Sequence, residues 1–175
     1  DALVYTPRIC GICSVTQSVA SARALADAMG LSMPKNGELC TNLVLASENI
    51  TDLITHFYLF FMPDFARDTY AGASWFGDIQ GRFKATAGSA ATQMLPARAD
   101  FLHLMGLMAG KWPHTLSLQP GGVTKAIEPK ERMRLLAIVA GFKRFLESTL
   151  FGDSLTTISQ LKSEAELWQW YQQKP

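Results

Sequence analysis

Apolar residues recur every three or four positions along most of the chain, which is the spacing of one face of an α-helix. The pattern predicts helices over residues 14–29, 37–62, 96–109, 129–150 and 163–171. Gly30, Pro63 and Gly152 stand where three of these helices should end, because glycine and proline commonly terminate helices. Strand patterns are weak and limited to a short alternation at 115–118. We therefore expect a mainly α fold, with long helices packed around an N-terminal cysteine loop.

Two of these segments also allow their burial to be predicted. Apolar side chains cover more than one face of the 37–62 segment, and a helix of that kind is normally buried. The 129–150 segment carries one apolar stripe, which we expect to face the core. The members of this stripe are Met133, Leu136, Val139, Ala140 and Phe145.

Composition narrows the class of protein. The 175 residues are enough for a single domain, 1–175, with a substantial core. A net charge of +1 gives no basic surface for a nucleic-acid partner. The odd number of cysteines, three, argues against a secreted disulfide framework and favours a cytoplasmic location. The most apolar stretch, 43–62, contains Glu48, Asp52 and His56, so we expect no membrane span.

The cysteine pair Cys10 and Cys13 is the main candidate for chemistry. Two sulfurs three residues apart can converge on one metal, but a site made of soft sulfur ligands usually needs four. The spacing alone also fits a redox pair or two small buried side chains. A thioredoxin-like redox pair expects a βαβ setting and a zinc ribbon expects a second C-x-x-C, and the sequence has neither. The predicted 14–29 helix starts directly after Cys13, and a helix N-terminus lowers the pKa of nearby thiols.

Flanking residues carry a resemblance to a known family. The run R-x-C-G-x-C at 8–13, followed by Ser-Val-Thr-Gln at 14–17, resembles the first signature of [NiFe] hydrogenase large subunits. Residues 52–58 resemble the family's D-H-x-x-H-F-Y segment, with Leu53 in place of the first histidine. Residues 110–114 and 121–123 resemble its G-K-x-P-H and G-G-V blocks. These blocks occur in the family's order along the first two-thirds of the chain.

The resemblance implies a site and a reaction. Cys10 would be the terminal nickel ligand and Cys13 would bridge nickel and iron, with CO and cyanide as further ligands of the iron. The enzyme would be a hydrogen:acceptor oxidoreductase that cleaves dihydrogen heterolytically and passes electrons to iron–sulfur clusters in a partner small subunit. Arg8 would support the thiolates, although a surface salt bridge is the alternative. His56 and His114 would lie close behind the metal ligands, although His56 also fits an ordinary core histidine.

Gln17 departs from the family's usual signature, which has histidine at this position. The glutamine resembles the regulatory, hydrogen-sensing branch, whose partner would be a sensor kinase or regulator. An uptake hydrogenase of the same lineage is the alternative. Glutamine forms hydrogen bonds but gains no charge near neutral pH, so Gln17 would alter proton transfer beside the bridging thiolate.

Several blocks of the family are absent from this chain. Its second pair, D-P-C-x-x-C, and its upstream R-G-x-E block do not occur in the sequence. We therefore expect the chain to be a segment of a larger large subunit. The alternatives are a degenerate scaffold that binds a partner without catalysis, and a zinc module completed by dimerisation.

Overall fold

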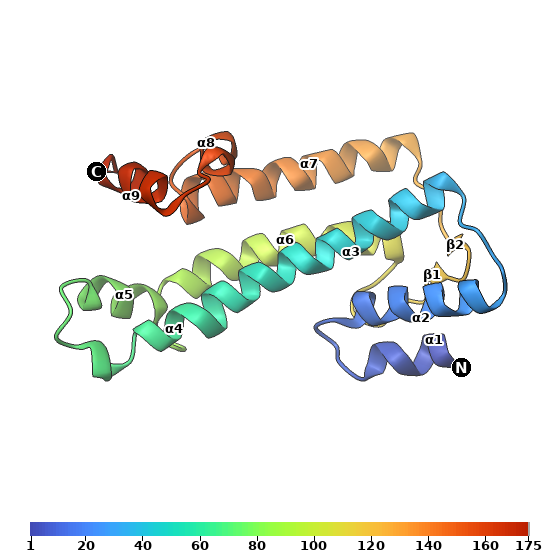
Figure 1. Ribbon diagram of the computed structural model, residues 1–175, viewed down its shortest axis with the longest axis horizontal. Helices are drawn as coiled ribbons and strands as arrows, with labels where there is room; N and C mark the ends of the chain where they lie inside the picture. The colour runs from blue at the N-terminus through green and yellow to red at the C-terminus, as the bar shows by residue number, and fades with distance from the viewer. Residues whose placement is uncertain (175) are drawn as a thin grey trace.

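The computed structural model describes residues 1–174 and is built mainly of helices (Figure 1). The N-terminal part contains α1 (Ala2–Tyr5), η1 (Thr6–Arg8), α2 (Ser14–Ala28) and α3 (Lys35–His56). The middle contains η2 (Phe57–Phe61), α4 (Met62–Phe65), η3 (Asp68–Tyr70), α5 (Phe76–Phe83) and α6 (Ala90–Ala109). The rest contains β1 (Leu118–Gln119), β2 (Gly122–Val123), α7 (Pro129–Phe145), η4 (Leu146–Leu150), α8 (Leu155–Gln160) and α9 (Glu164–Gln172). The expectation of a mainly α fold is confirmed.

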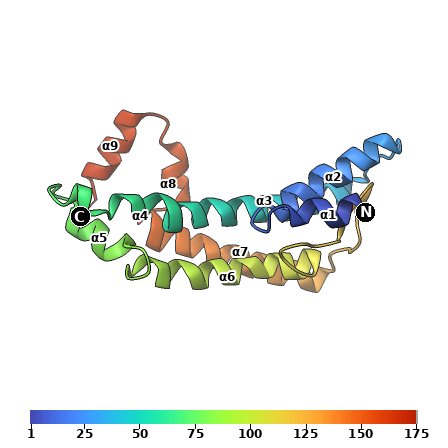
Figure 2. The same ribbon diagram turned by 90° about the horizontal axis from the view of Figure 1, so that it is seen from below.

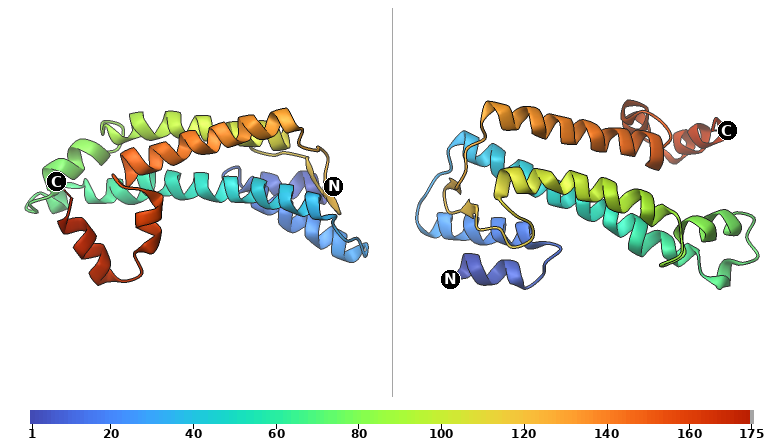
Figure 3. Two further views of the ribbon diagram at one scale, coloured as in Figure 1. Left: turned by 90° about the horizontal axis from the view of Figure 1, so that it is seen from above. Right: turned by 180° about the vertical axis from the view of Figure 1, so that it is seen from behind.

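Three long helices form the body of the molecule. The helix α6 packs against α3 on one side and against α7 on the other. All three helices run along the long axis of the molecule (Figures 1 and 2). The helices α1 and α2 lie at one end with the antiparallel pair β1–β2, and α4 and α5 lie at the opposite end (Figure 3). The helices α8 and α9 project away from the three long helices (Figure 2).

Two apolar clusters share α6. The first joins the second half of α3 to α6 and α7, with Ile54, Tyr58, Phe83, Ala90, Met94, Phe101, Leu104 and Phe142. The second joins α2 and β1 to the first half of α3 and the end of α6, with Val15, Val19, Val44, Met105, Met108, Ala109 and Leu118. The second cluster therefore fixes α2, and with it the cysteine loop, against α3.

Periodicity predicted several helices correctly, but two helix boundaries that were predicted from prolines are wrong. The segments 14–29, 129–150 and 163–171 are helical within a few residues of the expected ends. The helix expected to end at Pro63 continues to Phe65, because the π-helical turn η2 leads directly into α4, of which Pro63 is the second residue.

The helix expected to start at Pro96 begins six residues earlier, at Ala90. An interior proline costs about 3 kcal/mol. On either side of Pro96, α6 buries Met94 and Phe101, and full burial of each such side chain contributes about 2 kcal/mol or more. Packing therefore outweighs the local cost. The short helices α1, α5 and α8 were not predicted.

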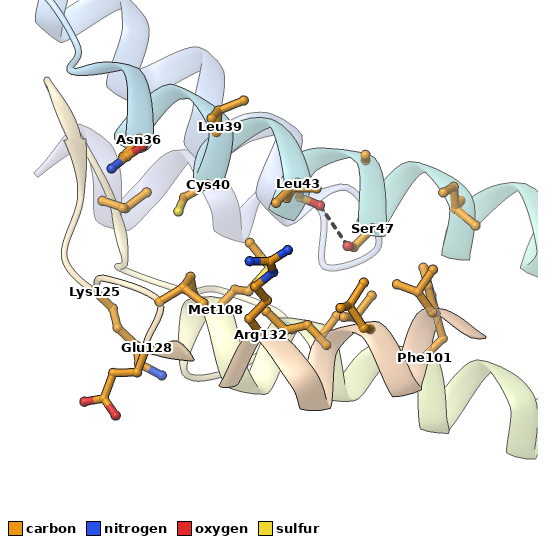
Figure 4. A pocket seen from close by; sticks show the side chains of 18 of the residues that line it. Asn36, Leu39, Cys40, Leu43, Ser47, Phe101, Met108, Lys125, Glu128 and Arg132 are labelled. Carbon is orange, nitrogen blue, oxygen red and sulfur yellow. Dashed lines mark hydrogen bonds between the residues drawn. The ribbon is translucent and has the colours of Figure 1, made fainter. Parts of the chain in front are cut away.

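The predicted burial of two apolar faces is wrong. Leu39, Leu43 and Leu53 of α3 are 51%, 55% and 68% exposed, and Met133 of α7 is 67% exposed. The reason is that both helices carry a second apolar face: α7 turns Phe142 toward α6, and Phe145 is the member of the predicted stripe that packs against this cluster. Part of the exposed surface lines a groove of about 1080 Å³ between α3, α6 and α7 (Figure 4). Within residues 1–174, every helix is too short or too polar to cross a membrane.

We predict that Phe142→Ala destabilises the chain by about 3–5 kcal/mol, because it removes a buried aromatic ring and leaves a cavity. The rings of Phe101 and Phe142 stack with their centroids 4.2 Å apart, and this contact joins α6 to α7. Urea unfolding measures the loss. Met133→Ala, an exposed truncation on the same helix, is the control and should change the free energy of unfolding by no more than about 0.5 kcal/mol. Equal effects of the two substitutions would contradict this account.

Candidate metal centre

The two cysteines lie in the loop between η1 and α2, which faces the middle of the molecule and not the N-terminus (Figure 1). The buried Pro7 anchors this loop at one side, while Ile9 is 80% exposed. Cys13 is the N-cap residue of α2, and Cys10 precedes it by three residues. Both thiols are free and half-buried. Sulfur atoms in such a loop are held by the fold and accessible to a ligand.

The two thiols form a hydrogen bond with each other, and this bond separates their pKa values. The Cys13 thiol donates to the Cys10 sulfur, which lowers the pKa of Cys10, and the backbone N–H groups of Cys13 and Ile12 lower it further. The same bond raises the pKa of Cys13, and burial adds to the rise. Cys10 is therefore the first of the pair to become a thiolate.

Gln17 lies one helical turn after Cys13 and reaches its sulfur. Its Nε2 donates to Cys13 Sγ at 3.1 Å, which opposes the rise in the pKa of Cys13 because the bond favours the thiolate. The Oε1 atom of Gln17 is buried and has no hydrogen-bond partner among the described residues. The sequence predicted Gln17 as a neutral neighbour of this sulfur, and the structure places it there.

The loop that follows α6 brings His114 to the same region. His114 Nδ1 lies 2.9 Å from the carbonyl oxygen of Pro7, and its backbone N–H donates to Ser14 Oγ at 3.3 Å. A carbonyl only accepts, so this contact requires a proton on Nδ1. The C-x-x-C and G-K-x-P-H blocks, about a hundred residues apart in the sequence, are therefore neighbours in the fold.

The structure does not bring Arg8 or His56 to the thiols. The Arg8 guanidinium donates to the carbonyl oxygen of Val4 and is exposed. His56 is the last residue of α3 and is exposed, with its ring stacked at 6.2 Å from that of Phe60. It lies two turns, or about 12 Å, beyond Glu48 along the same helix. The expected core or near-metal position of His56 is not the position observed.

Sequence reasoning missed Glu48 as a residue of this site. Its side chain is only 2% exposed, and its carboxylate accepts hydrogen bonds from the backbone of Val15 and Thr16 and from the indole of Trp112. The available signal was a glutamate within an apolar helical stretch. A buried charge needs hydrogen-bond partners, but the sequence does not say which residues they are.

Cys40 lies on a different surface. It is half-buried on α3 and lines the groove between α3 and α7 (Figure 4). Among residues 1–174, no group of three or more His, Cys, Asp or Glu side chains is placed to hold a metal ion. The Cys10–Cys13 pair therefore offers two adjacent soft ligands, which is half of a four-sulfur set.

We predict that Cys10 is alkylated by iodoacetamide at lower pH than Cys13 in the folded chain, because the thiolate is the reactive form and the pKa of Cys10 is the lower one. Peptide mass spectrometry after timed alkylation measures both rates. Gln17→Leu removes the donor to Cys13 and should move the profile of Cys13 to still higher pH. The unfolded chain is the control, in which the two profiles should coincide. Coinciding profiles in the folded chain would contradict the hydrogen-bond arrangement.

Comparison with known proteins gives matches to one group. Residues 1–73 match the family described as nickel-dependent hydrogenase. One subunit of the F420-non-reducing hydrogenase vhc of Methanococcus voltae is 27% identical over 153 residues, which are 86% of this chain and 31% of that protein. The uptake hydrogenase large subunit of Rhodobacter capsulatus is 40% identical over 58 residues, which are 33% of this chain and 10% of that protein.

Solved structures agree with these sequence matches. The reduced Ni-Fe-Se hydrogenase from D. vulgaris Hildenborough superposes with a TM-score of 0.71 at 26% identity, over 86% of this chain and 32% of that chain. This chain thus spans about a third or less of the proteins it matches. The predicted resemblance is confirmed at this level, while the hydrogen-sensing branch is not distinguished. In sequence and in fold, the chain is similar to part of these hydrogenases.

Proposed function

We propose that this chain forms part of a [NiFe] hydrogenase large subunit in which Cys10 and Cys13 supply two of the four thiolate ligands of the metal centre. The observation that carries the proposal is the pair of free, half-buried thiols three residues apart in a segment that matches nickel-dependent hydrogenases. Two adjacent soft sulfurs fit a nickel–iron pair. The reaction is the heterolytic cleavage of dihydrogen, and the whole subunit supplies the other two thiolates.

The residues of this chain have separate roles in the proposal. When bound, the nickel–iron centre, with CO and cyanide on the iron, supplies the Lewis acidity that polarises dihydrogen. Cys10 would hold the metals through Sγ, and it ionises before Cys13 because its pKa is the lower one. Cys13 would hold the metals beside Cys10, and Gln17 stabilises its thiolate with one neutral donor. His114 holds the loop through its contact with Pro7.

Arg8 and His56 are less well placed than the other residues for a role at the metals. The Arg8 guanidinium would have to leave the Val4 carbonyl before it could approach a thiolate. His56 lies at the C-terminal end of α3, about two turns beyond Glu48. We therefore assign His56 no part in the chemistry at the metals.

The proposal includes partners and a location. Electrons leave through iron–sulfur clusters of a small subunit, with which the large subunit forms a heterodimer. The free cysteines are consistent with the reducing conditions of the cytoplasm. Uptake hydrogenase large subunits are among the relatives, at 38–40% identity over 58 residues, so an uptake role is the second candidate.

The sensing role rests on Gln17. An amide beside the bridging thiolate gains no charge near neutral pH, whereas histidine in the same place could carry a proton. A site with slower proton transfer suits a sensor, which reports hydrogen to a kinase and needs little turnover. The contact between Gln17 Nε2 and Cys13 Sγ supports this reading because it places the amide directly against the sulfur.

Cysteine substitutions test the metal site. In the complete protein, coexpressed with maturation proteins and the small subunit, Cys10→Ser and Cys13→Ser should each abolish nickel incorporation and lower deuterium–proton exchange by at least about 10³-fold, since a hydroxyl is a poor soft-metal ligand. Elemental analysis and mass spectrometry of the exchanged gas measure the two effects. Cys40→Ser is the matched control and should behave as the unmodified protein. Full nickel content in both site variants would refute the proposed ligands.

The substitution Gln17→His tests the proposed assignment to the hydrogen-sensing branch. If Gln17 limits proton transfer, the histidine variant should turn over hydrogen about tenfold or more faster with a dye acceptor, with a rate that changes across about pH 6–8. The infrared bands of the CO and cyanide ligands should shift, because the hydrogen bond to the bridging sulfur changes. Unchanged turnover together with unchanged bands would show that Gln17 does not set the behaviour of this site.

A further inference from the structure

The first turn of α2 lacks the usual local cap. Backbone N–H groups at a helix N-terminus have no partner within the helix, and the N-cap side chain normally accepts from one of them. The N-cap residue of α2 is Cys13, whose side chain makes no capping hydrogen bond. A thiol is a weak acceptor, and a sulfur that binds a metal cannot also turn toward these amides. Another residue must therefore satisfy the first turn.

Glu48, from the middle of α3, meets this need. Its Oε1 accepts from the backbone N–H of Val15 at 2.8 Å, and its Oε2 accepts from that of Thr16 at 2.8 Å. These are the second and third residues of α2, whose N–H groups an N-cap side chain ordinarily binds. The hydroxyls of Ser14 and Thr16 also donate, at 3.4 and 3.1 Å. Glu48 thus caps α2 from a neighbouring helix.

The same carboxylate holds a third segment. Trp112 Nε1 donates to Oε1 at 2.9 Å, and the Arg98 guanidinium lies 5.3 Å from the centre of the Trp112 ring. Arg98 Nε in turn donates to Thr55 Oγ1 on α3 at 2.8 Å. Glu48 therefore connects α3, the start of α2 and the loop that carries His114. These are the elements around the cysteine pair.

Every partner of the Glu48 carboxylate is a donor. An ionised carboxylate accepts at both oxygens, whereas the amide of glutamine accepts at one and donates from the other. Glutamine at this position would place its NH₂ against Thr16 N–H or against Val15 N–H and the Trp112 indole. Within residues 1–174, no lysine, arginine or histidine forms a salt bridge with Glu48, so N–H groups and hydroxyls alone compensate this buried group.

We propose that Glu48 is a positioning residue for the cysteine pair: by capping α2 from α3, it fixes Cys13 and leaves its sulfur free for the metal and for Gln17. The part of this inference that concerns metal rests on the proposed function. The part that concerns the cap stands on the hydrogen bonds alone. Glu48 acts through Cys13 and touches neither sulfur.

Binding of nickel to the full chain distinguishes a positioning role of Glu48 from an effect of its charge alone. The charge of Glu48 is a minor contribution that raises the pKa of both cysteines. If Glu48 acted through charge only, Glu48→Gln would ease deprotonation and tighten binding of Ni²⁺. Positioning predicts the opposite, an apparent Kd about tenfold weaker, as is typical when the support of a metal ligand is lost. Thiolate-to-nickel charge-transfer absorption, in a titration with Ni²⁺ alone, measures the Kd.

Two further variants complete the nickel test. Glu38→Gln, which makes the same charge change at an exposed position in the first turn of α3, should bind Ni²⁺ like the unmodified chain. Glu48→Asp keeps the charge but shortens the reach, so it should weaken binding as Glu48→Gln does. It also serves as the test variant if circular dichroism shows that Glu48→Gln does not fold. Equal or tighter binding in a folded Glu48 variant would overturn the proposal.

A metal-free arm tests the cap directly. Hydrogen exchange at the amides of residues 14–16 should accelerate at least about tenfold in the Glu48 variants and stay unchanged in Glu38→Gln. Alkylation of Cys13 relative to Cys40 should change in parallel. If the unmodified chain bound no Ni²⁺ through its cysteines, the proposed metal function would fail. Unchanged exchange and an unchanged alkylation ratio in the Glu48 variants would overturn the positioning role by themselves.

Discussion

The arrangement of the site depends on one buried carboxylate that receives only hydrogen-bond donors. Glu48 joins the first turn of α2 to α3 and to the loop of Trp112. Isolated burial of a charge is costly, and here backbone dipoles at a helix N-terminus offset that cost. Because α2 starts at the residue after Cys13, the position of the sulfur follows from how this turn is held. The cysteine loop is thus held in place by the contact between α2 and Glu48 of α3, while its sulfurs remain accessible.

The sequence predicted the long helices because their periodicity is a local property. It failed at Pro63 and Pro96, where tertiary packing tolerates a residue that locally disfavours a helix. Burial was harder to predict for a different reason. The helix α7 has two apolar faces, and periodicity cannot show whether Phe142 or Met133 meets α6. Only the partner helix decides between the two faces.

The site was predictable to the extent that its residues lie close together in sequence or in a known motif. Cys10, Cys13 and Gln17 share one loop and one helical turn, so their proximity follows from spacing. His114 was expected near them through the resemblance, and its hydrogen bond to Ser14 agrees. Glu48 acts across more than thirty residues of sequence, and only the packing of α2 on α3 reveals its partners. His56 belongs to a motif block, yet its position at the end of α3 separates it from the thiols.

The proposed function also accounts for the two features that are unusual in an apolar chain of this size. One is a pair of soft ligands without the further ligands that such a metal site needs. The other is the apolar surface of α3 and α7, which lines the groove between them instead of a closed core (Figure 4). In a protein about three times as long, as the matched relatives are, additional chain would both supply the missing thiolates and cover this surface. The same requirement for more protein thus arises independently from the ligand chemistry and from the hydrophobic effect.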